Sequence, residues 1–374
     1  MRPCHSTITP AVVHRQARAA LQSALPWKPF GQTVAVADLL DLLLLMAASA
    51  ASLFAVVRRF FPFSHETAGR AVKANLPDSA QLVQGLLHAL YATAALSRQD
   101  RRRRWLVAID THYLPYYGRR TPGILGGPRK QGTKWFFGYA TAVLLHQRRR
   151  YTIALSPLAP RTKPHEVVAA LLRQLAEQGL KIRGVVLDSA FDSGETFLLL
   201  QQRGLAYTVP LRRKGNTRNA RNRLFEGRHK QVRWVAWNVK DTPRQVRTRT
   251  VLWKGRRRTL LFAFQGWRPA RAHGVHHEAA RQQRLYRRRF GIETSYRQKN
   301  QARATTTSRD PVYRLLLEGL GYVLRQLWVV LTAQLQPGRS RSRAALALPL
   351  RRLADWLVRE LSGLHPEALS IAVP

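Results

Sequence analysis

The stretch Trp105-Leu-Val-Ala-Ile-Asp110 places a carboxylate at the end of an apolar run with the length of a buried β-strand. Gly184-Val-Val-Leu-Asp188 repeats this arrangement later in the chain. In α/β folds, ligand sites lie at the ends of strands, so the two acids could converge at one sheet edge. A strand-ending Asp also commonly starts a turn or caps a helix, so each residue alone is weak evidence. As a pair they predict a site.

The segments around these two stretches predict a mixed α/β layer. Short apolar runs with turn-rich connections indicate strands, and apolar residues at helical spacing indicate helices. The predicted order is strand, strand, strand, helix, strand, helix, strand, at 105–109, 135–145, 151–155, 164–178, 184–187, 196–202 and 206–210.

The flanking sequence differs in composition from this layer. We expect a helical N-terminal domain that could bind DNA, two parts of a core separated by a β-rich basic insertion, and a C-terminal basic linker with a helix. The corresponding boundaries are 1–100, 101–211 and 276–336 for the core, 212–275 for the insertion, and 337–374.

The N-terminal region contains two ambiguous segments. Residues 39–57 are apolar enough to suggest a membrane span, but Asp41 and the run of alanines that follows favour a buried helix pair. Residues 64–73 could be the second helix of a helix-turn-helix, or part of a plain helical packing domain.

The chain has a formal net charge of +43 over 374 residues, so a polyanion is the expected partner, and nucleic acid is the first candidate. At 45% hydrophobic residues it also has ample material for a core, which excludes a disordered basic tail. The single cysteine, Cys4, excludes an intramolecular disulfide and a multi-cysteine zinc site, and it favours an intracellular, cytoplasmic protein.

A third acid lies alone in a basic segment. Between Glu278 and Asp310 there are nine Arg or Lys residues and one carboxylate, Glu293, within Tyr286-Arg-Arg-Arg289-Phe-Gly-Ile-Glu293. On a continuous helix one face carries Tyr286, Arg289, Glu293, either Tyr296 or Arg297, and Asn300. Glu293 therefore either forms an exposed ion pair with Arg289 or joins Asp110 and Asp188 as a cation ligand.

Three carboxylates from two strands and a helix are the oxygen donors that Mg²⁺ or Mn²⁺ prefers. Two such ions, held by Asp110, Asp188 and Glu293, can support in-line phosphoryl displacement. Asp192 is an alternative to Asp188, although its place beyond the strand suits a helix N-cap better. His112, His276 and His277 lack partners at metal-ligand spacing, so we expect them to be solvent-exposed or DNA-facing.

These residues resemble the DDE transposases of insertion sequences, specifically insertion-sequence family four with its Tyr-x2-Arg-x3-Glu-x6-Lys signature. Tyr286, Arg289 and Glu293 match it, whereas Asn300 stands at the Lys position and Lys299 lies one residue early. The resemblance implies an α/β, RNase H-like core interrupted by a β-rich insertion, with catalysis at Asp110, Asp188 and Glu293. It also implies cleavage of transposon ends, with joining of the ends to target DNA by strand transfer.

The resemblance further implies that Tyr286 and Arg289 contact DNA phosphates, and we assign Arg297 and Lys299 to DNA binding as well. Tryptophans of the insertion stack on an unpaired base in relatives, which makes Trp234, Trp237, Trp253 and Trp267 candidates, although each is also a plausible core residue. The expected partner is double-stranded DNA, namely terminal inverted repeats and target, bound by a homodimer without membrane association.

Two other functions stay open. One is a decayed or domesticated DNA-binding protein that binds ends without cutting them. The other is a related metal-dependent nuclease without strand transfer. The presence of all three acids favours an enzyme, whereas the departure at Asn300 favours decay.

Overall fold

The computed structural model describes residues 8–146, 149–215, 220–226, 232–256, 258–267, 275–335 and 348–363. Its centre is one nine-stranded mixed sheet in the order β2-β3-β1-β5-β6-β9-β8-β7, with β4 beside β3. The strands are β1 (Arg104–Tyr116), β2 (Leu125–Lys130), β3 (Thr133–His146), β4 (Arg149–Pro157), β5 (Lys181–Leu187), β6 (Ala206–Pro210), β7 (Arg233–Asn238), β8 (Gln245–Lys254) and β9 (Thr259–Gln265).

The strands β4, β3, β1, β5 and β6 form the RNase H-like part of this sheet. β3 runs antiparallel to β1 and β4, and β5 and β6 run parallel to β1 and to each other. The parallel strands are connected by helices, α7 (Pro164–Glu177) before β5 and α8 (Gly194–Gln202) before β6. The predicted α/β, RNase H-like fold class is confirmed.

The β-rich segment predicted at 212–275 extends this sheet and does not form a separate layer. β9 pairs with β6 in antiparallel fashion, with Thr208 opposite Phe264, and β8 and β7 follow. Since β6 would otherwise expose an unpaired edge, the added strands satisfy its backbone groups.

From residue 8 onward, six helices precede the sheet, and each expected stretch of helix is present. They are α1 (Pro10–Gln22), α2 (Val36–Ala48), α3 (Leu53–Phe60), α4 (His65–Ala74), α5 (Ser79–Ala94) and the short α6 (Arg98–Arg102). Ser64 caps α4 and Asp78 caps α5, each by accepting a hydrogen bond from a backbone N–H of the first turn. The apolar stretch 39–57 is the bent pair α2 and α3, at an angle of 118°.

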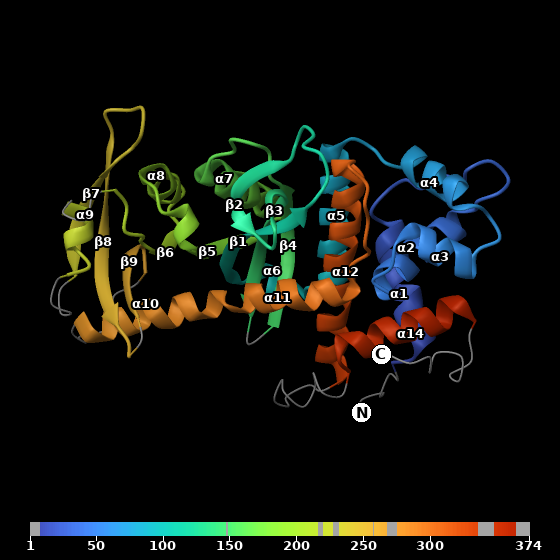
Figure 1. Cartoon of the computed structure of the whole chain (residues 1–374). Coiled ribbons are helices and arrows are strands. Elements are labelled where there is room, and N and C mark those ends of the chain that lie inside the picture. Colours follow the sequence, from blue (N-terminus) through green and yellow to red (C-terminus); the bar gives the residue numbers. More distant parts are fainter. Residues whose placement is uncertain are drawn as a thin grey trace, which may run out of the picture.

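The C-terminal helices α12 (Pro311–Leu335) and α14 (Leu350–Ser362) pack against these N-terminal helices, whereas α10 (Val275–Arg289) and α11 (Gly291–Lys299) pack against the sheet. The short α9 (Ala220–Arg223) lies earlier in the chain. Figure 1 shows α12 beside α5, with α10 and α11 forming a nearly continuous rod along the sheet. At Gly319 an added Cβ would overlap the side chain of Leu86, so glycine lets α12 approach α5 closely. The N-terminal helices, the C-terminal helices and the sheet share one hydrophobic core.

Helix α12 is the one helix of the described chain that is long and apolar enough by itself to cross a membrane, and 89% of its apolar window is buried inside the protein. Such burial is typical of a core helix. The predicted linker at 337–343 lies outside the described residues.

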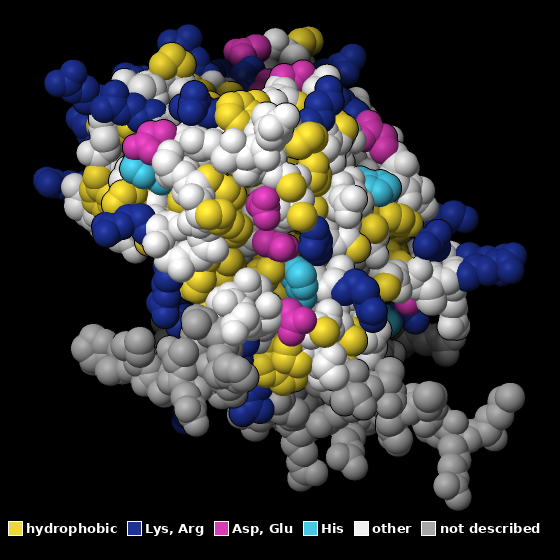
Figure 2. Space-filling model, turned by 90° about the vertical axis from the view of Figure 1, so that its right-hand side faces the viewer, with side chains coloured by type: hydrophobic (Ala, Val, Ile, Leu, Met, Phe, Trp, Pro, Cys, Tyr) yellow, Lys and Arg dark blue, Asp and Glu magenta, His cyan; other side chains and the backbone are white. Residues whose placement is uncertain are grey.

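Figure 2 views the molecule from the side on which α3, α4 and α14 lie. Lys and Arg side chains stand mainly toward the edges of this face, and apolar, acidic and His side chains lie nearer its middle. Its positive surface is therefore interrupted, and a DNA-binding role for α3 and α4 stays a prediction.

Candidate active site

The two Asp residues lie side by side at the centre of the sheet. Parallel strands β1 and β5 pair as far as Ile109 opposite Leu187, so Asp110 and Asp188 are the next residues on neighbouring strands. The prediction that Asp110 ends its strand is wrong, because β1 continues to Tyr116 through its pairing with β3. Asp188 does follow the end of β5 directly. Both acids therefore lie level with the C-terminal end of β5, where β5 stops and the neighbouring β1 continues.

Arg289 brings all three predicted acids together. Its Nη1 donates to Asp110 Oδ2 at 2.8 Å, and its Nη2 donates to Glu293 Oε1 at 3.0 Å and lies 3.9 Å from Asp188 Oδ1. The Arg289 side chain is 4% exposed, and its guanidinium lies over the rings of Tyr286 and Phe290. One buried cation thus links carboxylates from β1, the end of β5 and α11.

The i,i+4 ion pair of Arg289 with Glu293 exists, but it does not lie on a plain solvated surface. Arg289 ends α10 and Glu293 lies in α11, which begins at Gly291, so the expected continuous helix is interrupted at Phe290. The side chain of Glu293 is 47% exposed, whereas that of Asp110 is 9% exposed. Glu293 is therefore the acid of the three that solvent or a ligand reaches most easily.

Burial controls the ionisation of this cluster. It raises the pKa of Asp110 to about 6, although the nearby Arg289 opposes the shift. The pKa of Arg289 is itself raised, because the attraction of Asp110 and Asp188 outweighs its burial. The two pKa shifts are consistent, because the free-energy cost of desolvating the buried Asp110 carboxylate exceeds the favourable electrostatic energy that the single Arg289 cation supplies. The site therefore favours a positive charge next to Asp110.

The donor set fits a hard divalent cation, but its present geometry does not form a metal centre. All three acids offer oxygen, and the buried Asp110 retains an unfavourable charge that a cation would relieve. In the described part of the chain, no group of three His, Cys, Asp or Glu residues is arranged to hold a metal ion. The guanidinium of Arg289 lies where the acids converge.

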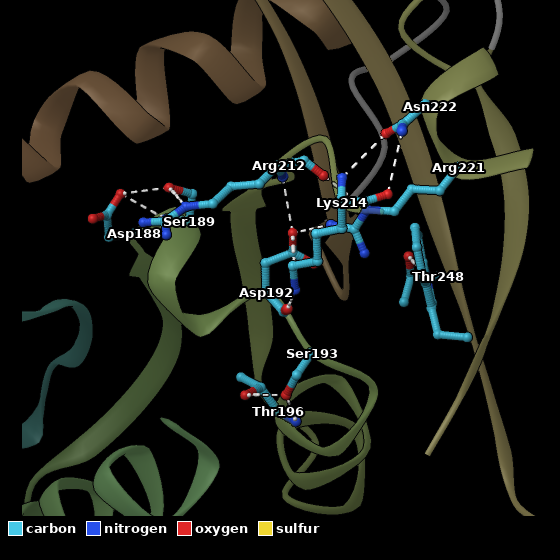
Figure 3. A network of polar contacts seen from close by, with 11 residues as sticks. Asp188, Ser189, Asp192, Ser193, Thr196, Arg212, Lys214, Arg221, Asn222 and Thr248 are labelled. Atoms are coloured by element: carbon cyan, nitrogen blue, oxygen red, sulfur yellow. Dashed lines mark hydrogen bonds and ion pairs between the residues drawn. The ribbon is translucent and has the colours of Figure 1, made fainter. Parts of the chain in front are cut away.

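Asp188 and Asp192 have different surroundings, as Figure 3 shows. Asp188 accepts a hydrogen bond from the backbone N–H of Ser189 at 2.6 Å, so it also caps the turn that follows β5. Asp192 is 1% exposed and is held by the backbone N–H of Arg212 and by the Arg221 guanidinium. Asp192 is not the N-cap that the sequence suggested, because Ser193 caps α8. It anchors the basic segment after β6.

Helix α11 has one face turned toward the protein interior and the opposite face turned toward solvent. Glu293, Arg297 and Asn300 are exposed, as their spacing of four and three residues predicts. Lys299 is 0% exposed, and its ammonium pairs with the buried Glu318 of α12. Lys299 is therefore not placed to contact DNA, because the one-residue offset from the signature position turns it inward. Arg297 keeps the exposure that a DNA contact requires.

The histidines differ from expectation in one case. His112 is half-buried on β1 and packs against Tyr296, with ring centroids 4.7 Å apart. Burial lowers its pKa to about 4, so the ring is neutral at pH 7. His277 is exposed, and the side chain of His276 lies outside the described residues.

Of the four tryptophan candidates, Trp234 has the exposure needed for base stacking. It is 55% exposed on β7, with Arg247 and Arg249 near its ring. Trp267 is buried, and its indole N–H donates to the Tyr207 carbonyl at 2.8 Å. Trp237 and Trp253 are partly buried and pack against the core.

Sequence reasoning missed Glu318, and it placed Tyr296 or Arg297 on the helix face of Glu293 without assigning a contact to Tyr296. Glu318 neutralises Lys299, and the Tyr296 hydroxyl pairs with Thr141 of β3 at 2.9 Å, which fixes α11 against the sheet. A lone acid within the apolar segment 311–335 was the available signal for Glu318.

The fold and the site together define an RNase H-like enzyme with an Asp-Asp-Glu cluster. The chain belongs to the family described as transposase DDE domain, whose model matches residues 101–310. It is therefore a transposase enzyme, and DDE transposases generally use divalent metal ions.

A solved structure supports the fold. The chain is similar to the piggyBac transposase in its synaptic complex with hairpin DNA, with a TM-score of 0.56 and 12% sequence identity. The match covers 100% of this chain and 84% of that chain. No curated protein matches the sequence.

Proposed function

We propose that this transposase cleaves the ends of an insertion sequence of family four and joins them to target DNA. The convergence of Asp110, Asp188 and Glu293 on the Arg289 guanidinium carries this proposal. The resemblance of the Tyr286, Arg289 and Glu293 spacing to the family-four signature supports the choice of element. The substrates are terminal inverted repeats and target DNA.

Asp110, Asp188 and Glu293 would hold two Mg²⁺ or Mn²⁺ ions. Bound there, such ions supply activation of a hydroxyl nucleophile and stabilisation of the leaving oxygen. Asp110 and Asp188 are positioned by neighbouring strands, so two of the donors are rigidly placed. Glu293 comes from a helix and is the adjustable third donor.

By the family resemblance, Arg289 and Tyr286 would contact the phosphate next to the scissile bond. Arg289 is 4% exposed and Tyr286 is 7% exposed in the DNA-free structure, so this contact requires both side chains to become accessible when DNA binds. The buried Nε of Arg289 has no hydrogen-bond partner among the described residues, which leaves a donor for an anionic oxygen. The guanidinium planar fork suits phosphate. Until DNA binds, the same group compensates the negative charge of the three acids.

The net charge of +43 supports DNA as the partner through phosphate neutralisation. The similar piggyBac structure was solved with hairpin DNA. Because two DNA ends are handled together in transposition, we infer a homodimer on DNA, in the cytoplasm of a bacterial or archaeal cell.

The test uses a labelled duplex that carries the sequences flanking the gene, incubated with protein and Mg²⁺. We expect nicks at the element ends and joined products. Asp188→Asn should abolish both while DNA binding is nearly unchanged, because one charge is lost from a strongly cationic chain. Asp355→Asn is the matched control, since its side chain is 50% exposed on α14.

Each other outcome has a distinct meaning. Cleavage by Asp188→Asn would contradict the assignment of the three acids. Nicks without joined products would identify a nuclease, and binding without nicks would identify a DNA-binding protein.

A further inference from the structure

A cavity lies on the same sheet face as the three acids. Side chains alternate along β1, so Asp110, His112, Leu114 and Tyr116 point to one face. Asp110 contacts Arg289 and His112 packs on Tyr296, both from the α10–α11 rod. Further along β1, Leu114 and Tyr116 line a cavity of about 440 Å³ beneath the segment 303–309. The cavity therefore lies on the same sheet face as the acids, past the C-terminal end of α11.

The lining of this cavity suits an anion. Arg303 and Arg309 contribute charge, and Thr305, Thr306 and Thr307 contribute hydroxyl groups, whereas the backbone N–H of Thr305 is already donated to the Ala51 carbonyl at 3.1 Å. Arginine side chains, hydroxyls and backbone N–H groups are common ligands of nucleic-acid phosphates. Arg309 is exposed, and the Arg303 side chain is 29% exposed, so both can meet a ligand.

The remaining charged residues of the lining are already engaged. Arg314 donates to the carbonyls of Ser308 and Thr306 and lies over the ring of Phe137, so it holds the segment in place. Glu318 is the acid of the lining, and it is compensated by Lys299 and, at 3.8 Å, by Arg303. The cavity keeps a net positive charge.

The exposed face of α11 connects the acids to this cavity. Along the chain, the exposed residues of this face are Glu293, Arg297 and Asn300. Arg303 comes next and lines the cavity. Helix α11 continues to Lys299 at roughly 1.5 Å per residue, and the 3-10 turn Asn300–Ala302 then advances roughly 2.0 Å per residue, so the path from Glu293 to the start of Arg303 is about 15 Å long. DNA advances about 3.4 Å per nucleotide of one strand, so this length spans roughly four nucleotides. No acid other than Glu293 lies among these exposed residues.

We propose that this cavity binds a backbone phosphate of the DNA strand whose reacting phosphate lies at Asp110, Asp188 and Glu293, roughly four nucleotides away. The inference rests on the proposed function and adds a second phosphate site to it. Arg309 and Arg303 neutralise the phosphate, the threonines donate hydrogen bonds to it, and Arg297 guides the strand between the two positions.

The first test measures binding to a short duplex of arbitrary sequence by fluorescence anisotropy at several KCl concentrations. Arg309→Gln should reduce the slope of log affinity against log salt by about 0.9, and so reduce the affinity lost between 50 and 200 mM salt roughly 3-fold. Arg173→Gln is the matched control, because Arg173 is exposed on α7. Helix α7 packs against β3 and β4, on the sheet face to which Thr111 and Tyr113 of β1 point. This face is opposite to the one that carries the acids and the cavity. Equal slopes for wild type and Arg309→Gln would overturn the proposal.

The second test locates the phosphate. Cys4 is the only cysteine, so a Cys4→Ser/Gln301→Cys variant carries one attachment point for an iron–EDTA cutting reagent, and Gln301 is exposed near the cavity but is not part of its lining. On the flanking-sequence duplex, we expect cutting centred roughly four nucleotides from the nick made at the element end. Cys4→Ser/Arg173→Cys should give no such centre. Normal nicking with no localised cutting from position 301 would overturn this proposal alone, whereas absence of nicking by the wild type would overturn the proposed function.

Discussion

The buried ion pair of Lys299 with Glu318 gives the sharpest test of how this chain departs from the insertion-sequence family four signature that it resembles. Both side chains are 0% exposed, and Arg303 lies 3.8 Å from the second oxygen of Glu318. Lys299→Met would leave Glu318 buried with only this more distant cation. Removing one partner of a buried pair typically costs about 3 to 5 kcal/mol of folding free energy. Because Arg303 remains, we expect about 3 kcal/mol.

Glu318→Gln gives a pH-dependent loss. Burial already lowers the pKa of Lys299 to about 8, so without Glu318 the amine is expected to fold in its neutral form. Keeping a lysine neutral at pH 7 costs at most about 4.6 kcal/mol, since its unfolded pKa is about 10.4. The unfolded chain binds the extra proton, so the stability of the variant rises with pH by about 2.7 kcal/mol between pH 7 and pH 9. Wild type gains about 1.4 kcal/mol over the same range, because its own Lys299 loses a proton near pH 8, so the loss should shrink by about 1.4 kcal/mol.

Urea unfolding of wild type, both single variants and Lys299→Met/Glu318→Leu measures these effects. The double variant should be more stable than either single variant, because no uncompensated charge remains from the pair. Its salt slope for DNA binding should equal that of wild type. A Lys299→Met protein that unfolds like wild type, but loses about 0.9 of salt slope, would instead make Lys299 a DNA contact and refute the structural assignment.

Two other sites give simpler predictions. Burial raises the pKa of Asp110 from 3.8 to about 6, so the native state holds a proton that the unfolded state has lost, and the contribution of this group to stability falls as pH rises through that window. Asp110→Asn should remove this decrease in stability, which urea unfolding midpoints measured near pH 3.8 and near pH 6 would show. An unchanged pH dependence in the variant would assign the decrease to another group. Trp234→Ala should weaken binding of DNA with an unpaired base by about 1 to 3 kcal/mol per stacked base at unchanged stability. Trp267→Ala should instead destabilise the fold by about 3 to 5 kcal/mol, because its indole is buried, and equal effects of the two changes on DNA binding would contradict a stacking role for Trp234.

Local sequence determined much of this protein. Apolar runs of strand length, helical spacing and capping residues such as Ser64 and Asp78 act between near neighbours, so the mixed α/β order and the N-terminal helices could be read from the chain. The acids Asp110 and Asp188 could be paired because each follows a buried apolar run, and parallel neighbours meet in register.

Tertiary structure decided what those residues contact. Strand β1 runs past Asp110 because β3 offers pairing as far as Tyr116, and the basic β-rich segment joins the sheet because β6 offers an open edge. Lys299 is buried by Glu318, which lies on another helix, and Arg289 lies between three acids from separate elements. These contacts depend on desolvation and on charges distant in the chain, so neither the spacing of a motif nor local propensity contains them.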